Sequence, residues 1–296
     1  MTTPAEQGSR MSSLRLLLGN PVTVVSAGLL IVIAFVAVTA NWIAPYEIND
    51  VDVPNALQPP SGTHWFGTDE LGRDVFSRVL VATQSSMRVA VVSVAFAVVV
   101  GVAVGVVSGY RGGWLDTVFM RVVDVMFAFP VLLLALAVVA ILGPGVTTTI
   151  LAIGIVYTPI FARVARASTM SVRVEPFVSV SRSMGTGHLY ILGRHILPNI
   201  AGPLVVQTSL SLAFAILSEA ALSFLGLGIQ PPQPSLGRMI FDSQGFVTMA
   251  WWMAVFPGAA IFVAVLAFNL LGDGLRDVLD PKQRTMIEAR ARKERK

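Results

Sequence analysis

Six apolar stretches without a charged residue constrain the fold of this chain more than any other feature. Each is about 17–25 residues long, the length that a helix needs to cross about 30 Å of hydrocarbon. They are Val22–Ile43, Val89–Val107, Val125–Leu142, Val146–Ala162, Ile200–Ser218 and Met249–Gly272. Only helices satisfy the backbone of such stretches within lipid. The sequence therefore predicts an all-α polytopic membrane protein with six transmembrane helices, and the charged fraction of 13% agrees.

The distribution of basic residues predicts the orientation of these helices, because cytoplasmic loops carry an excess of lysine and arginine. With the N-terminus in the cytoplasm, all but four of the 21 basic residues lie on the cytoplasmic side. The exceptions are Arg73, Arg78, Arg88 and Arg238. The expected location is therefore the cytoplasmic (inner) membrane, with both termini cytoplasmic. The sequence has no basic face interleaved with aromatic residues, so it does not indicate a nucleic-acid partner. Membrane lipid is the expected environment of this chain.

The same pattern divides the chain into segments. We expect a cytoplasmic N-terminal segment at 1–21, a first transmembrane helix at 22–43 and an external segment at 44–86. A core transmembrane domain follows at 87–272, with a cytoplasmic loop at 163–200 and a basic cytoplasmic tail at 273–296. The first apolar run is longer than the 7–15 residues of a secretory signal, which favours an uncleaved anchor. The chain has no cysteine, and so no disulfide or thiolate chemistry.

The polar stretch from Pro176 to Pro198 lies between two apolar runs and predicts a helix–turn–helix. Pro176 suits the first turn of a helix, and Gly185 suits the left-handed position after its end. A second helical run from His188 is expected to end before Pro198, which cannot continue it freely. Helical spacing places Phe177, Val180 and Met184 on one face, with Ser179 and Arg182 pointing elsewhere. Such an element suits docking in a groove, although an ordinary loop between membrane helices is the alternative.

Residues that could carry chemistry in the membrane are few. Glu219 is the one acid well inside an apolar span, and it is either a functional residue or a partner of a neighbouring loop. The polar run that follows Pro203 could line a pathway, and its members are Gln207, Thr208, Ser209 and Ser211. A stripe of small residues spaced four apart predicts close helix packing, and it comprises Ser93, Ala97, Gly101, Gly105 and Gly109.

No catalytic, cofactor or metal site is expected from the sequence. The topology separates His64 outside from His188 and His195 inside, so the three cannot build one metal site. Residues 67–74 resemble a phosphate-binding loop in spacing, but Arg73 and Asp74 stand where lysine and serine or threonine are required.

Several stretches together resemble a known family of transport proteins. Gly185 and Ile196–Pro198 resemble the cytoplasmic EAA loop of ABC importer permeases, with Ser179–Ser181 in place of Glu-Ala-Ala. Three further stretches resemble the C-type permease subunit of dipeptide, oligopeptide and nickel importers. They are His64–Arg78, Glu219–Ser235 and Trp251–Pro281.

The resemblance implies a type I ABC importer permease fold and a set of partners. These are a homologous second permease subunit, two cytoplasmic ATPases that carry ATP and Mg²⁺, and an external substrate-binding protein. It also implies that the EAA-like loop couples the chain to the ATPases. The coupling residues would be Phe177, Ser179, Val180, Arg182, Met184, Gly185, Thr186, Gly187 and Pro198; the candidate pathway residues are Gln207, Thr208, Ser211 and Glu219.

The expected cargo is dipeptides, oligopeptides or peptide-like solutes, and a nickel chelate is the alternative within the same resemblance. The spans contain no cysteine or histidine, so a bare divalent cation would find few ligands there. A secondary carrier or channel is an alternative of a different class. That class favours several buried charges along an ion path, and here Glu219 stands almost alone.

Overall fold

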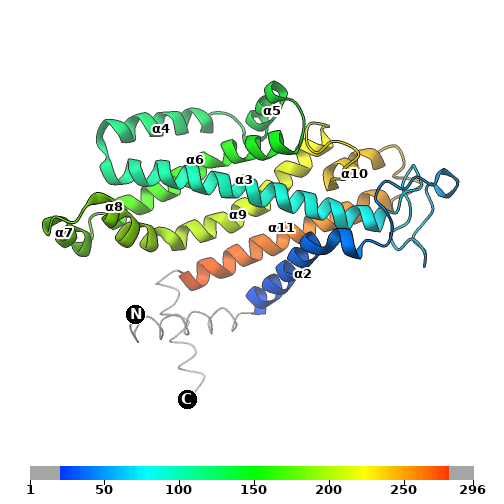
Figure 1. Ribbon diagram of the computed structural model, residues 1–296, viewed down its shortest axis with the longest axis horizontal. Coiled ribbons are helices and arrows are strands. Elements are labelled where there is room, and N and C mark those ends of the chain that lie inside the picture. The colour runs from blue at the N-terminus through cyan, green and yellow to red at the C-terminus, as the bar shows by residue number, and fades with distance from the viewer. Residues whose placement is uncertain (1–20, 280–296) are drawn as a thin grey trace, which may run out of the picture.

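The computed structural model describes residues 21–279, and within this range the chain is helical and contains no strand (Figure 1). The long helices are α2 (Pro21–Ile43), α3 (Val75–Arg111), α6 (Val146–Val172), α9 (Leu197–Phe224) and α11 (Trp252–Leu279). The shorter elements are η1 (Val53–Asn55), α4 (Gly113–Phe127), α5 (Val131–Leu142), α7 (Pro176–Ser183), α8 (His188–Tyr190), η2 (Ile191–Ile196) and α10 (Leu236–Ser243). This architecture confirms the predicted all-α polytopic membrane fold.

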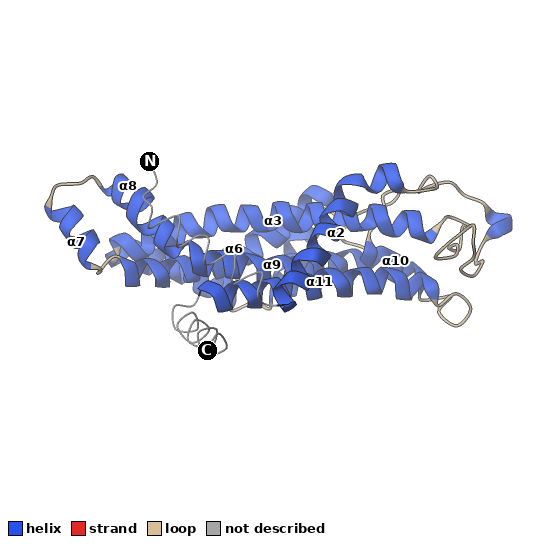
Figure 2. Cartoon of the chain, turned by 90° about the horizontal axis from the view of Figure 1, so that it is seen from below, coloured by secondary structure: helices blue, strands red, loops and turns tan. Residues whose placement is uncertain are grey.

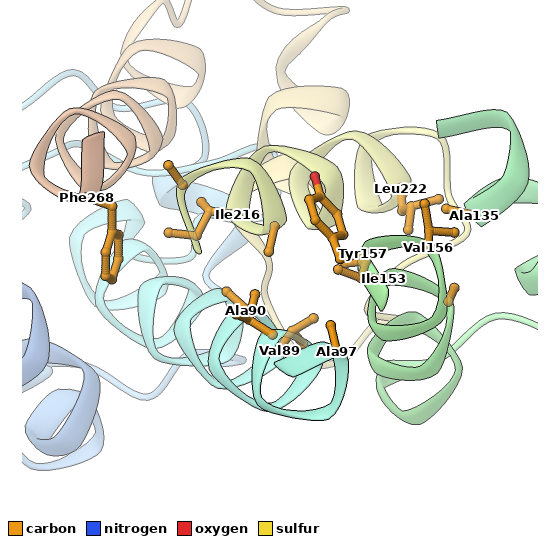
Figure 3. Close-up of a cluster of buried hydrophobic side chains, with 14 of the residues drawn as sticks. Val89, Ala90, Ala97, Ala135, Ile153, Val156, Tyr157, Ile216, Leu222 and Phe268 are labelled. Carbon is orange, nitrogen blue, oxygen red and sulfur yellow. The ribbon is translucent and has the colours of Figure 1, made fainter. Parts of the chain in front are cut away.

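The long helices lie side by side in an elongated bundle, so that the connections gather at its two ends (Figures 1 and 2). Helices α7 and α8 form one end, which we call the coupling end. The segment 44–74 and α10 form the other end, which we call the cap. Buried apolar side chains of α3, α6 and α9, among them Val89, Ile153 and Ile216, join Phe268 of α11 in the main core (Figure 3).

Helices α3 and α6 pack against each other through the predicted stripe of small residues. Ser93 and Ala97 are fully buried. A Cβ atom added to Gly101 would lie 2.6 Å from both the Phe161 Cβ and the Thr158 carbonyl oxygen. At Gly109 it would lie 2.7 Å from the carbonyl oxygen of Arg166. The stripe therefore serves contact within the chain, because only small residues let the two backbones approach this closely.

The continuous third span predicted at Val125–Leu142 is wrong. Its first residues form the last turn of α4, and α5 starts only at Val131, after a bend of 93° between the two helices. Pro130 has extended backbone (ψ 133°) before α5, and the residue preceding a proline is disfavoured in helical conformation. Five unbroken helices of the described chain are long and apolar enough to cross a membrane, and the α4–α5 pair supplies a sixth crossing if counted as one span.

The predicted end of the helix before Pro198 is also wrong, since α8, η2 and α9 form one helix from His188 to Phe224. The turn before the proline is a π-helix, in which the Leu197 amide donates to the Leu192 carbonyl five residues back. This wider turn relieves the clash that a proline ring makes with the carbonyl four residues earlier. The side-chain amide of Asn199 donates to the His195 carbonyl at 2.6 Å, which gives that carbonyl a hydrogen-bond partner.

Helix α3 begins at Val75, well before the apolar run expected at Val89–Val107. Asp74 caps this start: its carboxylate accepts hydrogen bonds from the Ser77 amide at 2.8 Å and the Ser77 hydroxyl at 2.7 Å. An aspartate at this position satisfies amides that have no partner within the helix. The part of α3 before Arg88 thus projects toward the cap, within the stretch that the sequence assigns to the external segment.

Candidate functional site

Helix α7 at the coupling end has the boundaries that the sequence predicts. It begins at Pro176 and is followed by Gly185 at φ +77°. The Thr186 amide donates to the Ser181 carbonyl, and the Gly185 amide donates to the Arg182 carbonyl. These two bonds form a Schellman motif, which requires the left-handed residue that glycine supplies without strain. The predicted conformation of Gly185 is confirmed.

The two faces of α7 differ sharply in exposure. Val178 is fully buried in a cluster with Val106 and Tyr110 of α3 and with Ile191 and Ile196 of η2. On the other side Phe177, Val180 and Met184 are 41%, 58% and 80% exposed. We call these three side chains the docking face. These exposed apolar groups lie on a helix that is anchored to the bundle, which makes the docking face a candidate contact surface.

Polar contacts hold this end of the molecule to α3. The Tyr110 hydroxyl and His188 Nδ1 are 2.9 Å apart, and the Arg182 guanidinium lies 5.4 Å from the centre of the Tyr110 ring. The Arg173 guanidinium donates to the Gly109 carbonyl at 2.7 Å. No local pattern in the sequence marks Tyr110 and Arg173, because their partners lie 78 and 64 residues away in the chain. From the sequence, His188 is expected only as the start of a helical run and as a histidine that cannot share a metal site with His64.

The remaining predicted coupling residues have plainer surroundings. The exposed Ser179 accepts a hydrogen bond at its backbone carbonyl from the Ser183 hydroxyl. Thr186 takes part in the turn through its amide, and Gly187 precedes α8 with extended backbone. Pro198 is exposed in the first turn of α9. The structure thus brings the predicted coupling residues together around α7, with Pro198 beyond the π-helical turn.

The predicted pathway residues do not share one surface. Gln207 and Thr208 of α9 are partly exposed; the Gln207 amide donates to the Ser211 hydroxyl at 3.1 Å, and Thr208 donates to the Leu204 carbonyl at 2.7 Å. Ser211 itself is 1% exposed. Ser209, also buried, donates to the Phe268 carbonyl of α11 at 2.7 Å. Within the chain alone, Gln207 and Thr208 are therefore the accessible members of this set.

Glu219 is fully buried where α9 approaches α3. Its carboxylate accepts hydrogen bonds from the Ser86 hydroxyl of α3 at 2.6 Å and from the Ser223 hydroxyl at 2.7 Å. Ser223 in turn accepts from the Ile229 amide at 3.1 Å. These contacts join α3, α9 and the turn that follows α9, which corresponds to the loop-partner alternative in the sequence analysis.

The cap brings two of the family-like stretches together. The Phe66 ring stacks on Phe256 at 3.8 Å between ring centres, and the Trp252 indole donates to the Thr68 carbonyl at 3.0 Å. Asp69, in the stretch that mimics a phosphate-binding loop, accepts hydrogen bonds from the Leu71 and Arg73 amides. The Asp69 carboxylate thus closes a turn within the cap. Among residues 21–279, no group of three or more histidines or acids is placed to hold a metal ion.

Glu70 of the cap is expected to make the stability of the fold depend on pH. Burial, followed by the neighbouring Asp69 carboxylate, raises its pKa above the ordinary value even though Arg73 donates to Glu70 Oε1 at 3.0 Å, and its buried Oε2 has no hydrogen-bond partner. A carboxyl whose pKa is higher in the folded state stabilises the fold below the unfolded-state pKa. That contribution is lost as the pH rises through the folded-state pKa. We therefore expect E70Q to raise the melting temperature at neutral pH, and the gain to shrink on acidification.

Thermal unfolding of the purified protein across a pH series checks this expectation. Glu47 is exposed, so E47Q is the matched control and should follow the wild-type pH profile. An E70Q melting temperature equal to or below that of the wild type at neutral pH would contradict the assignment.

Comparison with known proteins adds to this geometry. The family described as "Binding-protein-dependent transport system inner membrane component" matches residues 101–285. The N-terminal TM domain of oligopeptide transport permease C matches residues 11–60. A solved structure of the MetNI methionine ABC transporter in an inward-facing conformation superposes with a TM-score of 0.58. It covers 69% of this chain and 97% of that chain, and at 18% identity the superposition shows a shared fold alone.

Curated relatives are much closer in sequence. The dipeptide transport system permease protein DppC of Alkalihalophilus pseudofirmus is 43% identical over 260 residues, covering 87% of this chain and 86% of its own. The probable D,D-dipeptide transport system permease protein DdpC of Escherichia coli K12 is 42% identical over 267 residues, covering 90% of both chains. The glutathione transport system permease protein GsiD of Escherichia coli O6:K15:H31 is 48% identical over 257 residues, covering 85% and 84%.

These matches confirm the resemblance on which the sequence analysis relied. They extend over most of the chain, and the family match at residues 101–285 includes α7 and α10. The chain therefore belongs to the family of inner-membrane permease components of binding-protein-dependent transport systems.

Proposed function

We propose that this chain forms half of the translocation pathway of an ATP-driven importer and that α7 receives the motion of the partner ATPases. The docking face carries this proposal. Phe177, Val180 and Met184 are exposed on a helix that Val178 anchors to the bundle, at the end away from the cap. A short amphipathic helix of this kind fits a hydrophobic groove.

The contacts behind α7 supply a route for that motion. Val178 packs on η2, which continues without a break into α9, and the Tyr110–His188 contact joins α8 to the end of α3. A displacement of α7 would therefore act on two membrane helices together. Rigid elements that shift as units are a common means of switching between conformations. Closure of the ATPases would in this way turn the pathway from inward-facing to outward-facing.

The partners follow from the family. A homologous second permease would complete the pathway, two cytoplasmic ATPases would carry ATP and Mg²⁺, and an external binding protein would deliver the cargo to the cap. The chain would have no catalytic site of its own. In support, residues 67–74 lack the lysine of a phosphate-binding loop, and Asp69 engages the amides of this turn.

Short peptides or peptide-like solutes are the proposed cargo, as the names of the relatives indicate. Partly exposed Gln207 and Thr208 could offer hydrogen bonds to a peptide backbone beside apolar walls. Deletion of this gene should block growth on a short peptide as the source of a required amino acid, and should confer resistance to toxic peptides. Complementation with the intact gene should reverse both effects. Loss of nickel uptake alone would contradict the peptide assignment and favour the nickel-chelate branch.

The orientation of the chain gives a further expectation. Single cysteines can be placed without background, because the natural chain has none. In intact cells that express the chain without the ATPases, an impermeant thiol reagent should label cysteines at Asn55 and Gln233, which lie exposed on the cap side, and should spare a cysteine at the exposed Met184. After the membrane is opened all three should react. Labelling at position 184 in intact cells would contradict the proposed topology.

A further inference from the structure

A groove of about 770 Å³ lies between α2 and α3 on the half of the bundle nearer the cap. We call it the α2–α3 groove. Its walls include Ala34, Val38 and Asn41 of α2, and Gln84, Arg88 and Val91 of α3. None of these residues belongs to the docking face or to the candidate pathway set. The proposed transport mechanism leaves the groove without a role.

The groove is polar at one end and apolar at the other. Helices α2 and α3 run in opposite directions, so Asn41 meets Gln84 near the cap, and Ala34 lies near Val91 deeper in the bundle. The Asn41 amide donates to the Gln84 side-chain carbonyl at 3.1 Å, and the Gln84 amide donates to the Ala37 carbonyl at 2.8 Å. The side-chain amides of Asn41 and Gln84 therefore close the polar end of the groove, and both donate hydrogen bonds within the chain.

Arg88 stands between the two ends, one turn deeper along α3 than Gln84. It is exposed and makes no hydrogen bond or ion pair with any other residue from 21 to 279. Arg73, by contrast, pairs with Asp69 at 2.7 Å. Arg88 also directly precedes the charge-free run Val89–Val107. An unpaired cation at the edge of hydrocarbon is costly, and a nearby anion would stabilise it.

Trp42 indicates the depth of this arrangement in a membrane. It is 82% exposed and follows Asn41 directly. Exposed tryptophans gather at the membrane–water interface, so the Asn41–Gln84 contact lies near that level. Arg88 then lies just inside the interface, and Ala34, Val91 and Val92 lie within the hydrocarbon. The groove thus presents a cation at headgroup depth and an aliphatic wall below it.

We propose that the α2–α3 groove binds an anionic phospholipid. The phosphate would pair with Arg88, with the Ser85 hydroxyl beside it, and one acyl chain would lie along Ala34, Val38, Val91 and Val92. A peptide strand in the same place would leave its amides without partners against this aliphatic wall, which disfavours cargo as the occupant. The bound lipid would stabilise the packing of α2 on α3 and supply the missing counter-charge.

Photolabelling of the assembled transporter in nanodiscs tests this site. One preparation contains phosphatidylglycerol with a photoreactive group in its acyl chain, and a second contains phosphatidylcholine with the same group. The headgroups differ in charge, so adducts at Ala34–Val38 and Val91–Val92 should be about fivefold more abundant with phosphatidylglycerol, the factor expected for one basic residue near an anionic surface. R88Q should lower labelling to the phosphatidylcholine level, and R88K should restore it.

R121Q is the matched control, because Arg121 is an exposed arginine of α4 that does not line the groove. It removes the same charge and should leave labelling of the groove unchanged. Equal labelling of the wild-type groove by the two lipids would overturn the proposal without reliance on any variant. An excess that persists in R88Q would also overturn it. Displacement of the lipid by a short peptide would assign the groove to cargo instead.

Discussion

Replacing Val180 with aspartate is expected to reduce ATP-driven uptake to below a tenth of the wild-type rate while the protein remains in the membrane. Val180 is 58% exposed at the centre of the docking face, so the substitution should not disturb the core. Burying the Val180 side chain in a groove of the ATPase would contribute about 1.5–3 kcal/mol to docking. An unpaired carboxylate buried in that ATPase groove instead adds a desolvation cost. Uptake of labelled peptide by the complete complex measures the effect.

Ser183→Asp is the matched control for this experiment. It places the same charge on α7 at an exposed position outside the docking face. We expect uptake close to that of the wild type, and equal amounts of both variants in the membrane fraction. Wild-type uptake by V180D would show that this face does not engage the ATPases.

The second large effect is expected from Gly105→Leu in the α3–α6 contact. A Cβ atom at this position would overlap the Ala162 carbonyl oxygen and would lie 2.8 Å from Ala165 Cβ and 2.9 Å from the Arg166 amide nitrogen. The backbone of α6 cannot move aside as a flexible side chain would, and inserting groups into a packed core commonly costs about 1–3 kcal/mol or more. The variant should accumulate poorly and should melt at a lower temperature than the wild type.

Gly258→Leu gives the comparison for that effect. Gly258 also lies within a membrane helix, α11, but a Cβ atom there meets nothing within 4 Å. This variant should fold and accumulate normally. If G105L and G258L accumulate equally and melt together, the small residues of α3 do not determine its packing on α6.

Much of this architecture could be predicted from local patterns in the sequence. The apolar runs indicate the membrane helices, Pro176 and Gly185 delimit α7, and the four-residue spacing of small residues indicates the close helix contact. Each of these signals lies within one continuous stretch of the chain. At these positions the conformation or packing that the residue type favours is the one that the fold uses.

The differences arise where two local rules compete. A proline breaks the helix at Pro130, yet the helix runs through Pro198 because the preceding turn is π-helical and Asn199 engages the His195 carbonyl. Residue type alone does not distinguish these cases. The sequence likewise leaves two roles for Glu219, and its hydrogen bond to Ser86 joins residues that no local pattern connects.

Local sequence patterns could not predict the contacts between segments that lie far apart in the chain. The motif around Phe66 and the motif around Phe256 could each be recognised, but their stacking in the cap joins residues far apart in the chain. The same is true of Tyr110 and His188 at the coupling end. The first pairing joins two family-like stretches in the cap, and the second joins α3 to α8 at the coupling end.

Crosslinking from Met184→Cys in the assembled complex tests the central claim most directly. Met184 is 80% exposed on the docking face, and the natural chain has no cysteine, so within this chain a photoreactive thiol reagent attaches only at this position. The account predicts that light joins this chain to an ATPase subunit, and that V180D greatly reduces the product. Crosslinking to the external binding protein instead, with no ATPase product, would contradict it.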